Sequence, residues 1–371
     1  NIGGQIESDG DVDLDVEGRL ANVSGQITGA DITVAAGELE NSTAAIRDET
    51  AFGFEDRAQQ TGEIAANGNL EIAVEGDLTS EGGQFTAGGD ATLEAGGDIA
   101  IGALMLDSVR EQEFEEGYDN SFTREAELAG VTAGGNLTIA AGEDLTIAGA
   151  EIEAGGDAAL SAVGDVIISS VQEIQQEDYR FDIDTGGFFG VETNVRQQDQ
   201  ETTTEQTTIV AGGSLIITSA EGDLTLEAPA LESGGETILS AAEGTVSILT
   251  TEDTAFTRDE FREEDLFWWS SEDAGVSETT RTFTQIEAGG GLQIISGGDI
   301  IVEYTATGNF NEGIAQLASA PGLEWMAELE AMDNVAWQEA QTAFEEWNYE
   351  EQGLTEAGAL LVSVVTTFVL G

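Results

Sequence analysis

Apolar and polar residues alternate with a period of two in short stretches along most of this chain. Successive side chains of a β-strand point to opposite faces, so this pattern predicts short strands with one buried face. Turns that contain glycine separate the stretches, and glycine there allows a positive φ and a close approach of neighbouring segments. The alternating apolar pairs are Leu70/Ile72, Leu137/Ile139, Leu145/Ile147, Leu215/Ile217, Leu224/Leu226 and Val246/Ile248.

The phrase Ala-Gly-Gly, followed in most copies by Asp, Asn or Ser, recurs at a nearly fixed spacing. Copies begin at Ala87, Ala133, Ala154, Ala211 and Ala288. The spacing is 21 residues from 133 to 154 and 22 residues from 211 to a looser copy at 233. A repeat of this length is typical of a solenoid in which each repeat forms one coil. Short strands and glycine corners predict an all-β fold, a right-handed parallel β-helix.

Four stretches interrupt the repeat. The copies at 133, 211 and 288 are 78 and 77 residues apart, so each later interruption follows two coils. If the phase is kept, the interruptions leave from one corner and stack along one side. Threonine-rich flanks around a central turn favour β-hairpin insertions. Nine of the ten arginines lie in these insertions. The insertions are placed at about 43–65, 109–131, 172–208 and 250–286.

The pattern changes after Tyr304. Pro321 can open a helix, and Leu323, Met326, Leu329 and Met332 follow at helical spacing. We therefore predict a parallel β-helix over 1–305 and a small α-helical cap and linker over 306–371. The uncharged stretch 357–371 is short for a membrane span. A second apolar face, also interpreted as helical, comprises Val335, Trp337, Ala340, Phe344 and Trp347.

The composition narrows the chemistry. The 371 residues include 74 Asp and Glu against 10 arginines, a formal charge of −64, with no lysine, histidine or cysteine. Such a charge disfavours binding to nucleic acid or to anionic membranes. Without cysteine or histidine there is no disulfide framework and no common transition-metal ligand, so we predict no cofactor and no metal site. The Gly-Gly-Asp turns match a calcium-binding repeat poorly, because their period is 21 and not nine.

The repeated phrases resemble the haemagglutinin repeats of filamentous haemagglutinins and of contact-dependent growth inhibition exoproteins, the large partners of two-partner secretion. Stretches 187–190 and 266–271 resemble the insertions in those repeats, and 337–359 resembles the pretoxin segment before the C-terminal toxin. The absence of lysine departs from the family's insertions. Asn1 and the lack of a signal sequence suggest an internal piece of a longer protein.

The resemblance implies a secreted rod on the bacterial cell surface or outer membrane. Such a rod mediates cell contact and delivers a C-terminal toxin to neighbouring bacteria. The implied partners are an outer-membrane two-partner secretion transporter, the target-cell surface or outer membrane, and the toxin with its immunity protein. A purely structural adhesin stalk is the alternative. A polysaccharide-acting β-helix enzyme is less favoured, because regular repeats provide no irregular catalytic cleft and most nucleophile–base arrangements lack their residues.

Adjacent aromatic residues in the insertions are the candidate interaction residues: Phe188, Phe189, Phe267, Trp268 and Trp269. Three large rings in a row cannot all face inward on one strand, so the stretch 267–269 is the hardest to explain by packing alone, and exposed aromatic residues are commonly associated with contacts. The alternative is that the rings pack on the coil or on one another. No catalytic residue is predicted.

We expect the fold to depend on salt. The acidic excess and the lack of lysine suit a protein that works in very high salt, where counter-ions screen self-repulsion, so a halophilic source is a hypothesis. The chain should lose structure in dilute buffer and regain it in molar salt, as measured by circular dichroism. Spectra that do not change with salt concentration would contradict this.

Overall fold

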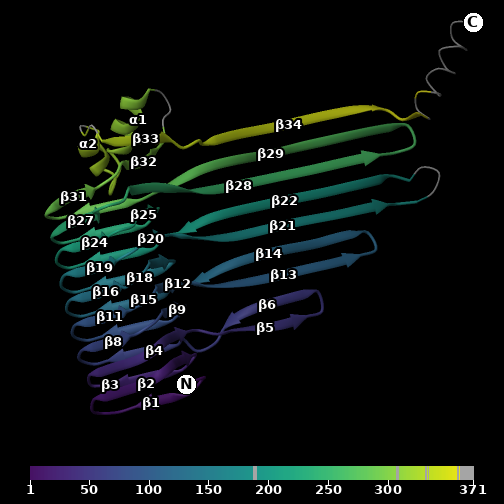
Figure 1. Ribbon diagram of the computed structural model, residues 1–371. Helices are drawn as coiled ribbons and strands as arrows, with labels where there is room; N and C mark the ends of the chain where they lie inside the picture. Colours follow the sequence, from purple (N-terminus) through teal and green to yellow (C-terminus); the bar gives the residue numbers. More distant parts are fainter. Residues whose placement is uncertain (187–189, 306–308, 331, 333, 357–358, 360–371) are drawn as a thin grey trace, which may run out of the picture.

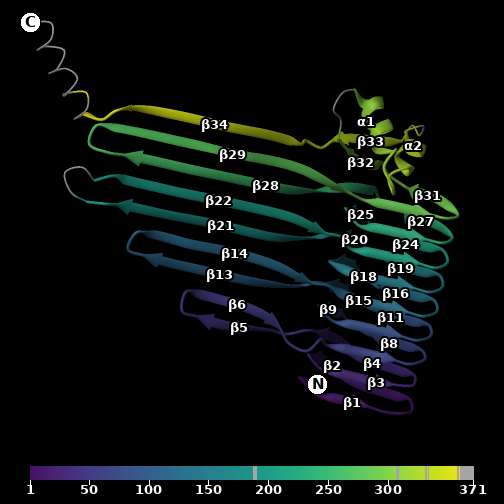
Figure 2. The ribbon, with the colours of Figure 1, turned by 180° about the vertical axis from the view of Figure 1, so that it is seen from behind.

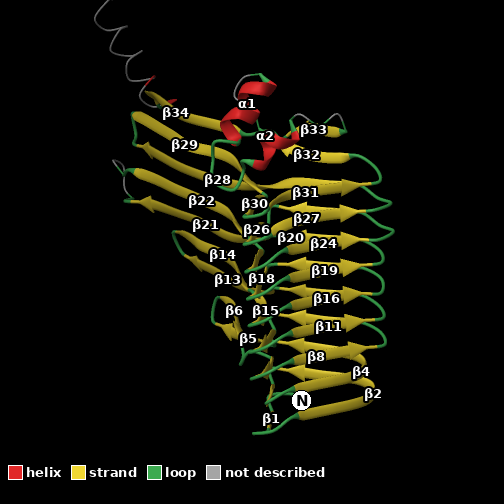
Figure 3. Ribbon diagram, turned by 90° about the vertical axis from the view of Figure 1, so that its left-hand side faces the viewer, coloured by secondary structure: helices red, strands yellow, loops and turns green. Residues whose placement is uncertain are grey.

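The computed structural model describes residues 1–186, 190–305, 309–330, 332, 334–356 and 359. The chain winds into a stack of coils, and a second sheet stands out from one side of the stack (Figure 1). The same two parts are visible from behind and from the side (Figures 2 and 3). The structure confirms an almost all-β chain with long parallel and mixed sheets. The right-handed β-helix itself stays a prediction.

Strands of successive coils pair in parallel, as the repeat predicts. One parallel sheet takes nine strands, one from each successive coil. They are β1 (Gln5–Glu7), β3 (Gln26–Gly29), β7 (Glu63–Ala66), β10 (Gln84–Ala87), β15 (Ala129–Ala133), β18 (Ala150–Ala154), β23 (Thr208–Ala211), β26 (Ala230–Ser233) and β30 (Gln285–Ala288).

The remaining sides of the coils are two further parallel ladders. Their strands are β2 (Val12–Val23), β4 (Ile32–Ser42), β8 (Leu70–Val74), β9 (Leu78–Glu81), β11 (Ala91–Ala95), β12 (Ile99–Gly102), β16 (Leu137–Ala141), β17 (Leu145–Ala148), β19 (Ala158–Ala162), β20 (Val166–Ser169), β24 (Leu215–Ser219), β25 (Leu224–Glu227), β27 (Glu236–Ala241), the start of β28 (Val246–Glu264), β31 (Gly291–Ser296), β32 (Ile300–Tyr304) and β33 (Val335–Glu339).

Inward-facing residues of the coils stack in columns and form the core. The predicted alternating pairs are all buried, including Leu70 at 1% and Ile72 at 0% exposure. Parallel pairing in register places equivalent residues directly above one another, so each column repeats one apolar position from coil to coil. One such column consists of Ile27, Ile64, Phe85, Val131, Ile152, Ile209, Leu231 and Ile286.

The polar residue that closes many of the glycine-containing turns accepts a hydrogen bond from the backbone of the next coil. The Asp144 side chain accepts a hydrogen bond from the Asp165 backbone N–H at 2.7 Å, and Asp165 accepts one from Asp223 at 2.8 Å. Each side chain thus satisfies a turn N–H that no strand partner reaches. The first column of turns is Asp31, Asn69, Asp90, Asn136, Asp157 and Ser214; the second is Asp77, Asp98, Asp144, Asp165, Asp223 and Thr245.

The glycines at these turns serve close approach. A Cβ on Gly134 would lie 2.3 Å from the carbonyl oxygen of Gly88, and one on Gly155 would lie 2.3 Å from that of Gly134. Neither glycine has a positive φ. The expectation of close approach is therefore confirmed at these turns, and the expectation of a positive φ is wrong there.

The insertions form antiparallel hairpins that join into one sheet, which we call the hairpin sheet. Its pairing order is β5–β6–β13–β14–β21–β22–β28–β29–β34. The strands lengthen from 6 residues in β5 to 14 in β21, so the sheet widens toward the C-terminal end of the stack (Figure 1). Besides β28, they are β5 (Ala45–Thr50), β6 (Gly53–Ala58), β13 (Leu104–Phe114), β14 (Gly117–Glu127), β21 (Val171–Asp184), β22 (Glu192–Glu205), β29 (Trp268–Phe283) and β34 (Ala343–Leu354).

Two short helices cover the last coil, and two strands, β33 and β34, follow them in the described part of the predicted helical region. The helices are α1 (Phe310–Leu317) and α2 (Trp325–Leu329). Leu323, Met326 and Leu329 are buried in the core cluster of the coils, whereas Met332 is 42% exposed. The helical interpretation of 335–347 is wrong, because β33 continues the coil beside β32 and β34 joins the hairpin sheet. No helix in the described part of the chain is long and apolar enough to cross a membrane.

The turn columns generate a stability prediction. Asp144→Ala should lower the free energy of unfolding by about 1 kcal/mol, because the Asp165 N–H loses its acceptor. Asp144→Asn keeps an acceptor and removes a negative charge from between Asp98 and Asp165, so it should be neutral or stabilising at low salt. Urea denaturation measures both variants.

Asp13→Ala is the matched control, because Asp13 is exposed on β2 and no hydrogen bond of its side chain is observed in the described part of the chain. An equal loss of stability in Asp144→Ala and Asp144→Asn would show that the acceptor is not what the turn requires.

Candidate interaction surface

The hairpin sheet has two faces, and arginine is concentrated on one of them. Directly opposed residues of an antiparallel sheet point to the same face, and neighbours along a strand alternate. The register therefore defines an arginine face, which includes Arg124 and its opposite residue Asp107, and a second face, which includes Phe181 and Val195. The arginines on the arginine face are Arg47, Arg124, Arg180, Arg196, Arg258, Arg262 and Arg281.

Each of these arginines pairs with a carboxylate. Arg124 and Arg258 each use two nitrogens, with Nε bonds of 2.8 Å to Asp107 and 3.0 Å to Asp273. Arg47 pairs with Asp56 and also lies 3.6 Å above the centre of the Phe54 ring. Cross-strand pairs of opposite charge stabilise neighbouring strands, each by a fraction of a kcal/mol where they are exposed. The guanidinium groups that pair across strands, such as Arg124 and Arg258, thus help to hold an acidic sheet together, whereas Arg180 and Arg262 pair within their own strands.

The same pairs shift the acidity of their carboxylates. The hydrogen bonds from Arg196 hold the pKa of Asp178 below its ordinary value. Bonds from Arg258 and then from the Trp347 indole lower the pKa of Asp273. Both carboxylates remain ionised near neutral pH, and the stability that they contribute is lost only as the pH falls through the lowered pKa. A general acid needs a raised pKa, so these two groups are poorly suited to that role.

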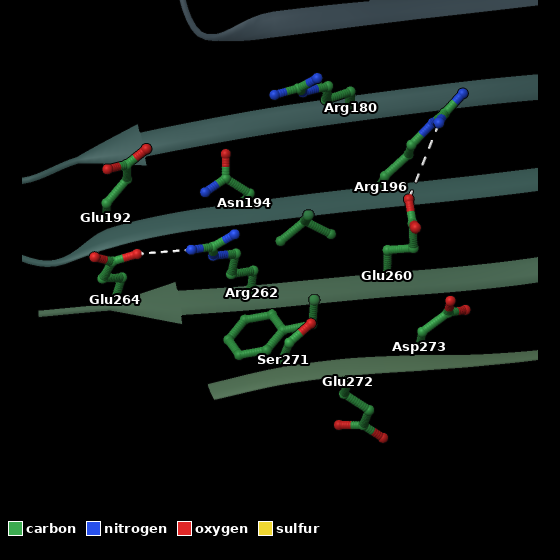
Figure 4. A pocket seen from close by; sticks show the side chains of 12 residues that line it. Arg180, Glu192, Asn194, Arg196, Glu260, Arg262, Glu264, Ser271, Glu272 and Asp273 are labelled. Atoms are coloured by element: carbon green, nitrogen blue, oxygen red, sulfur yellow. Dashed lines mark hydrogen bonds and ion pairs between the residues drawn. The ribbon is translucent and has the colours of Figure 1, made fainter. Parts of the chain in front are cut away.

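A shallow depression of about 610 Å³ lies mostly on the arginine face, toward the outer part of the sheet. Figure 4 shows Arg180, Arg196 and Arg262 around it, together with acidic side chains. Arg180 pairs with Asp182 at 3.1 Å, and Arg262 pairs with Glu264 at 2.8 Å. Each of the three guanidinium groups that line this depression is already paired with a carboxylate, so it could bind an anion only by giving up that ion pair. Within the described residues, no group of three or more Asp or Glu side chains is arranged to hold a metal ion.

The predicted aromatic residues Phe267, Trp268 and Trp269 lie at the tip of the hairpin β28–β29. Asp265 accepts hydrogen bonds from the N–H groups of Phe267 and Trp268, both at 2.7 Å, which holds the turn. Trp268 lies opposite Leu354 on the second face, and each side chain is 44% exposed. Phe188 and Phe189 lie outside the described residues.

The neighbouring Trp269 points to the arginine face and packs. It lies opposite Gly353, and a Cβ on that glycine would lie 2.9 Å from the indole Nε1. Trp268 and Trp269 thus point to opposite faces, and Trp268 is the most exposed of the three adjacent aromatic residues. Whether Trp268 contacts a partner stays a prediction.

Trp347 joins β34 to the hairpin sheet, a role that the sequence pattern did not predict. Trp347 lies opposite Gly275, where a Cβ would lie 2.4 Å from the indole ring. Its Nε1–H donates to Asp273 at 2.9 Å, and its ring centre is 6.0 Å from that of Phe256. An isolated glycine in a strand often marks a close approach, so Gly275 was the available signal.

Comparisons with known proteins agree with the repeated pattern. The hemagglutinin repeat family matches residues 54–113, 111–195 and 189–265, and a second haemagglutinin repeat family matches 1–50 and 274–320. A relative, the 16S rRNA endonuclease CdiA of Enterobacter cloacae subsp. cloacae, is 33% identical over 101 residues. That match covers 26% of this chain and only 3% of the relative. No solved structure matches. With the family matched over more than half of its length, this chain belongs to the hemagglutinin repeat family.

Proposed function

We propose that this chain is the repeat region of a secreted, cell-surface exoprotein of two-partner secretion, folded as a right-handed parallel β-helix. An outer-membrane transporter is its secretion partner. Support comes from the family, from the parallel register of successive coils and from the partial likeness to CdiA. In this role the coils are a scaffold and the hairpin sheet is the part that meets other molecules.

One observation carries the contact role. The distal part of the hairpin sheet exposes apolar side chains in a chain of charge −64: Ile183 at 41%, Phe261 at 39% and Trp268 at 44%. All three lie on the second face by register. Exposed apolar groups on a soluble surface commonly mark contacts with another molecule. A structural stalk needs only the coils, so the hairpin sheet favours adhesion to the target-cell surface.

Delivery of a C-terminal toxin to neighbouring bacteria completes the proposal. In it, the stretch 337–359 begins the pretoxin segment, and the toxin and its immunity protein belong to the full-length exoprotein. The likeness to a CdiA protein whose name describes a 16S rRNA endonuclease supports a toxin-bearing relative, without identifying the toxin. A polysaccharide-acting enzyme is not favoured, because the carboxylates with shifted pKa values are held ionised by arginine.

Trp268→Ser tests the contact role. In the full-length exoprotein on producing cells, we expect secretion and surface display to persist, because Trp268 is exposed at a hairpin tip. Attachment to target cells, and inhibition of them, should fall at least about tenfold if the ring is an interface anchor. Surface labelling, attachment counts and competition between the strains measure these effects.

Trp268→Phe should retain most of the activity, and Ile46→Ser is the matched control. Ile46 is 48% exposed on β5, at the opposite edge of the same sheet. Normal attachment by Trp268→Ser would remove the contact role from this residue. Normal attachment but lost inhibition would place its role after contact.

A further inference from the structure

In the part of the chain that the structure describes, the hairpin sheet ends in a long strand with one free edge. Among the described residues, β34 pairs with β29 from Thr279↔Ala343 to Trp268↔Leu354 and with no other strand. It is the outermost strand of the sheet in both views (Figures 1 and 2). In an antiparallel strand, alternate residues direct their N–H and C=O groups to each edge. The 12 residues of β34 therefore present a row of backbone donors and acceptors to solvent.

This edge differs from the other edge of the same sheet. The opposite edge strand, β5, has 6 residues, whereas β34 has 12 residues paired in an unbroken register without a bulge. Long, flat edges without proline or bulges are templates for pairing with another strand. The geometry for adding one more strand is already present along β34.

The exposed rings of β34 lack a neighbour on the open side. Phe344 is 66% exposed on the second face, and Tyr349 is 63% exposed on the arginine face. Trp347, which packs over Gly275 of the covered neighbour, is only partly exposed. Cross-strand partners cover such rings inside a sheet, so a strand added at the free edge would cover Phe344 and Tyr349 from opposite faces.

The charges of β34 specify the partner. Glu345 and Glu351 lie on the arginine face, and Glu346 and Glu350 lie on the second face. None of the four has an ion pair within the described part of the chain. Some carboxylates elsewhere in the sheet face arginine on an adjacent strand, as Glu260 faces Arg196. The edge thus offers two unpaired negative charges on each face.

These charges also exclude other occupants. Two copies of β34 paired edge to edge would bring glutamates close to glutamates, and the charge of −64 on each chain adds long-range repulsion. Residues 357–371 carry no charge and so do not complement the edge. A basic strand fits both the hydrogen-bonding edge and its glutamates.

We propose that the free edge of β34 binds an extended segment of another polypeptide as a further antiparallel strand. The segment presents arginine or lysine to both faces, in register with Glu345, Glu346, Glu350 and Glu351. Backbone hydrogen bonds supply affinity that tolerates sequence variation, and the four cross-strand ion pairs select basic segments and their register. This inference does not depend on the proposed toxin delivery or on Trp268.

A fluorescent peptide tests the proposal directly. The probe is the 12-residue sequence Thr-Val-Thr-Arg-Arg-Thr-Val-Thr-Arg-Arg-Val-Thr, which places an arginine opposite each glutamate when it pairs antiparallel to 343–354. We expect saturable binding by fluorescence anisotropy and slower hydrogen exchange of alternate amides within 343–354. The same peptide with N-methyl groups on the alternate backbone nitrogens that face β34 in this register should not bind, because that edge then lacks its hydrogen-bond donors.

Charge reversal separates strand addition from attraction to an acidic surface. Glu346→Lys with Glu350→Lys should weaken binding at least tenfold and should let a glutamate version of the peptide bind. The matched control is Glu151→Lys with Glu153→Lys on β18, where both residues are exposed on the coil. It changes the net charge equally and should leave binding within about twofold.

Four results would overturn the proposal. Two are equal binding of the N-methylated peptide and an equal loss of binding in the β18 control. The third is protection of the amides of 343–354 from exchange that grows with the concentration of this chain when no peptide is present. The fourth is peptide binding that is seen only when the chain is truncated after Glu356. The third result would assign the edge to a second copy, and the fourth would assign it to the chain's own tail.

Discussion

The spacing between β-strands is the constraint on which this architecture depends. Each coil adds one strand to each side of the stack, a rise of about 4.8 Å, and a hairpin is two strands wide, about 9.6 Å. A hairpin inserted after every second coil therefore fills the rise of those two coils. Insertions after every coil would collide, and insertions after every third coil would leave an unpaired gap. The unbroken pairing from β5 to β34 follows from this match.

The turns stabilise the same spacing with a polar column. A short side chain with an oxygen reaches the backbone N–H one coil away, and glycine lets the turns approach that closely. The column from Asp77 to Asp223 consists of aspartates, so like charges stack along one corner, whereas the column from Asp31 to Asp157 alternates Asp with Asn. Each hydrogen bond opposes the repulsion between neighbouring carboxylates, and counter-ions reduce that repulsion.

The local alternation of apolar and polar residues predicted the coils. It predicted the wrong secondary structure where pairing with a strand distant in the sequence determines the conformation. Leu70 and Ile72 alternate within one strand, so their burial needs no distant information. Trp337 and Trp347 also fit a helical period, but they lie in strands β33 and β34, which pair with β32 and β29. The Trp347 ring packs on Gly275, which is 72 positions away in the chain. Sequence spacing indicated that hairpins stack. It could not predict their mutual register, because Arg196 meets Glu260 only after both hairpins have formed.

The stack of coils and the hairpin sheet have different groups at their C-terminal ends: the stack ends in apolar side chains, and the sheet ends in backbone polar groups. An uncovered last coil would present its apolar cross-section to water, and Ile314, Trp325 and Met326 from α1 and α2 cover it. An uncovered sheet edge presents polar groups, which water can solvate at little cost. Glutamates along that edge oppose pairing with acidic copies of the chain without removing the backbone donors and acceptors. The glutamates that keep β34 from pairing with another acidic strand therefore also make its edge selective for a basic strand.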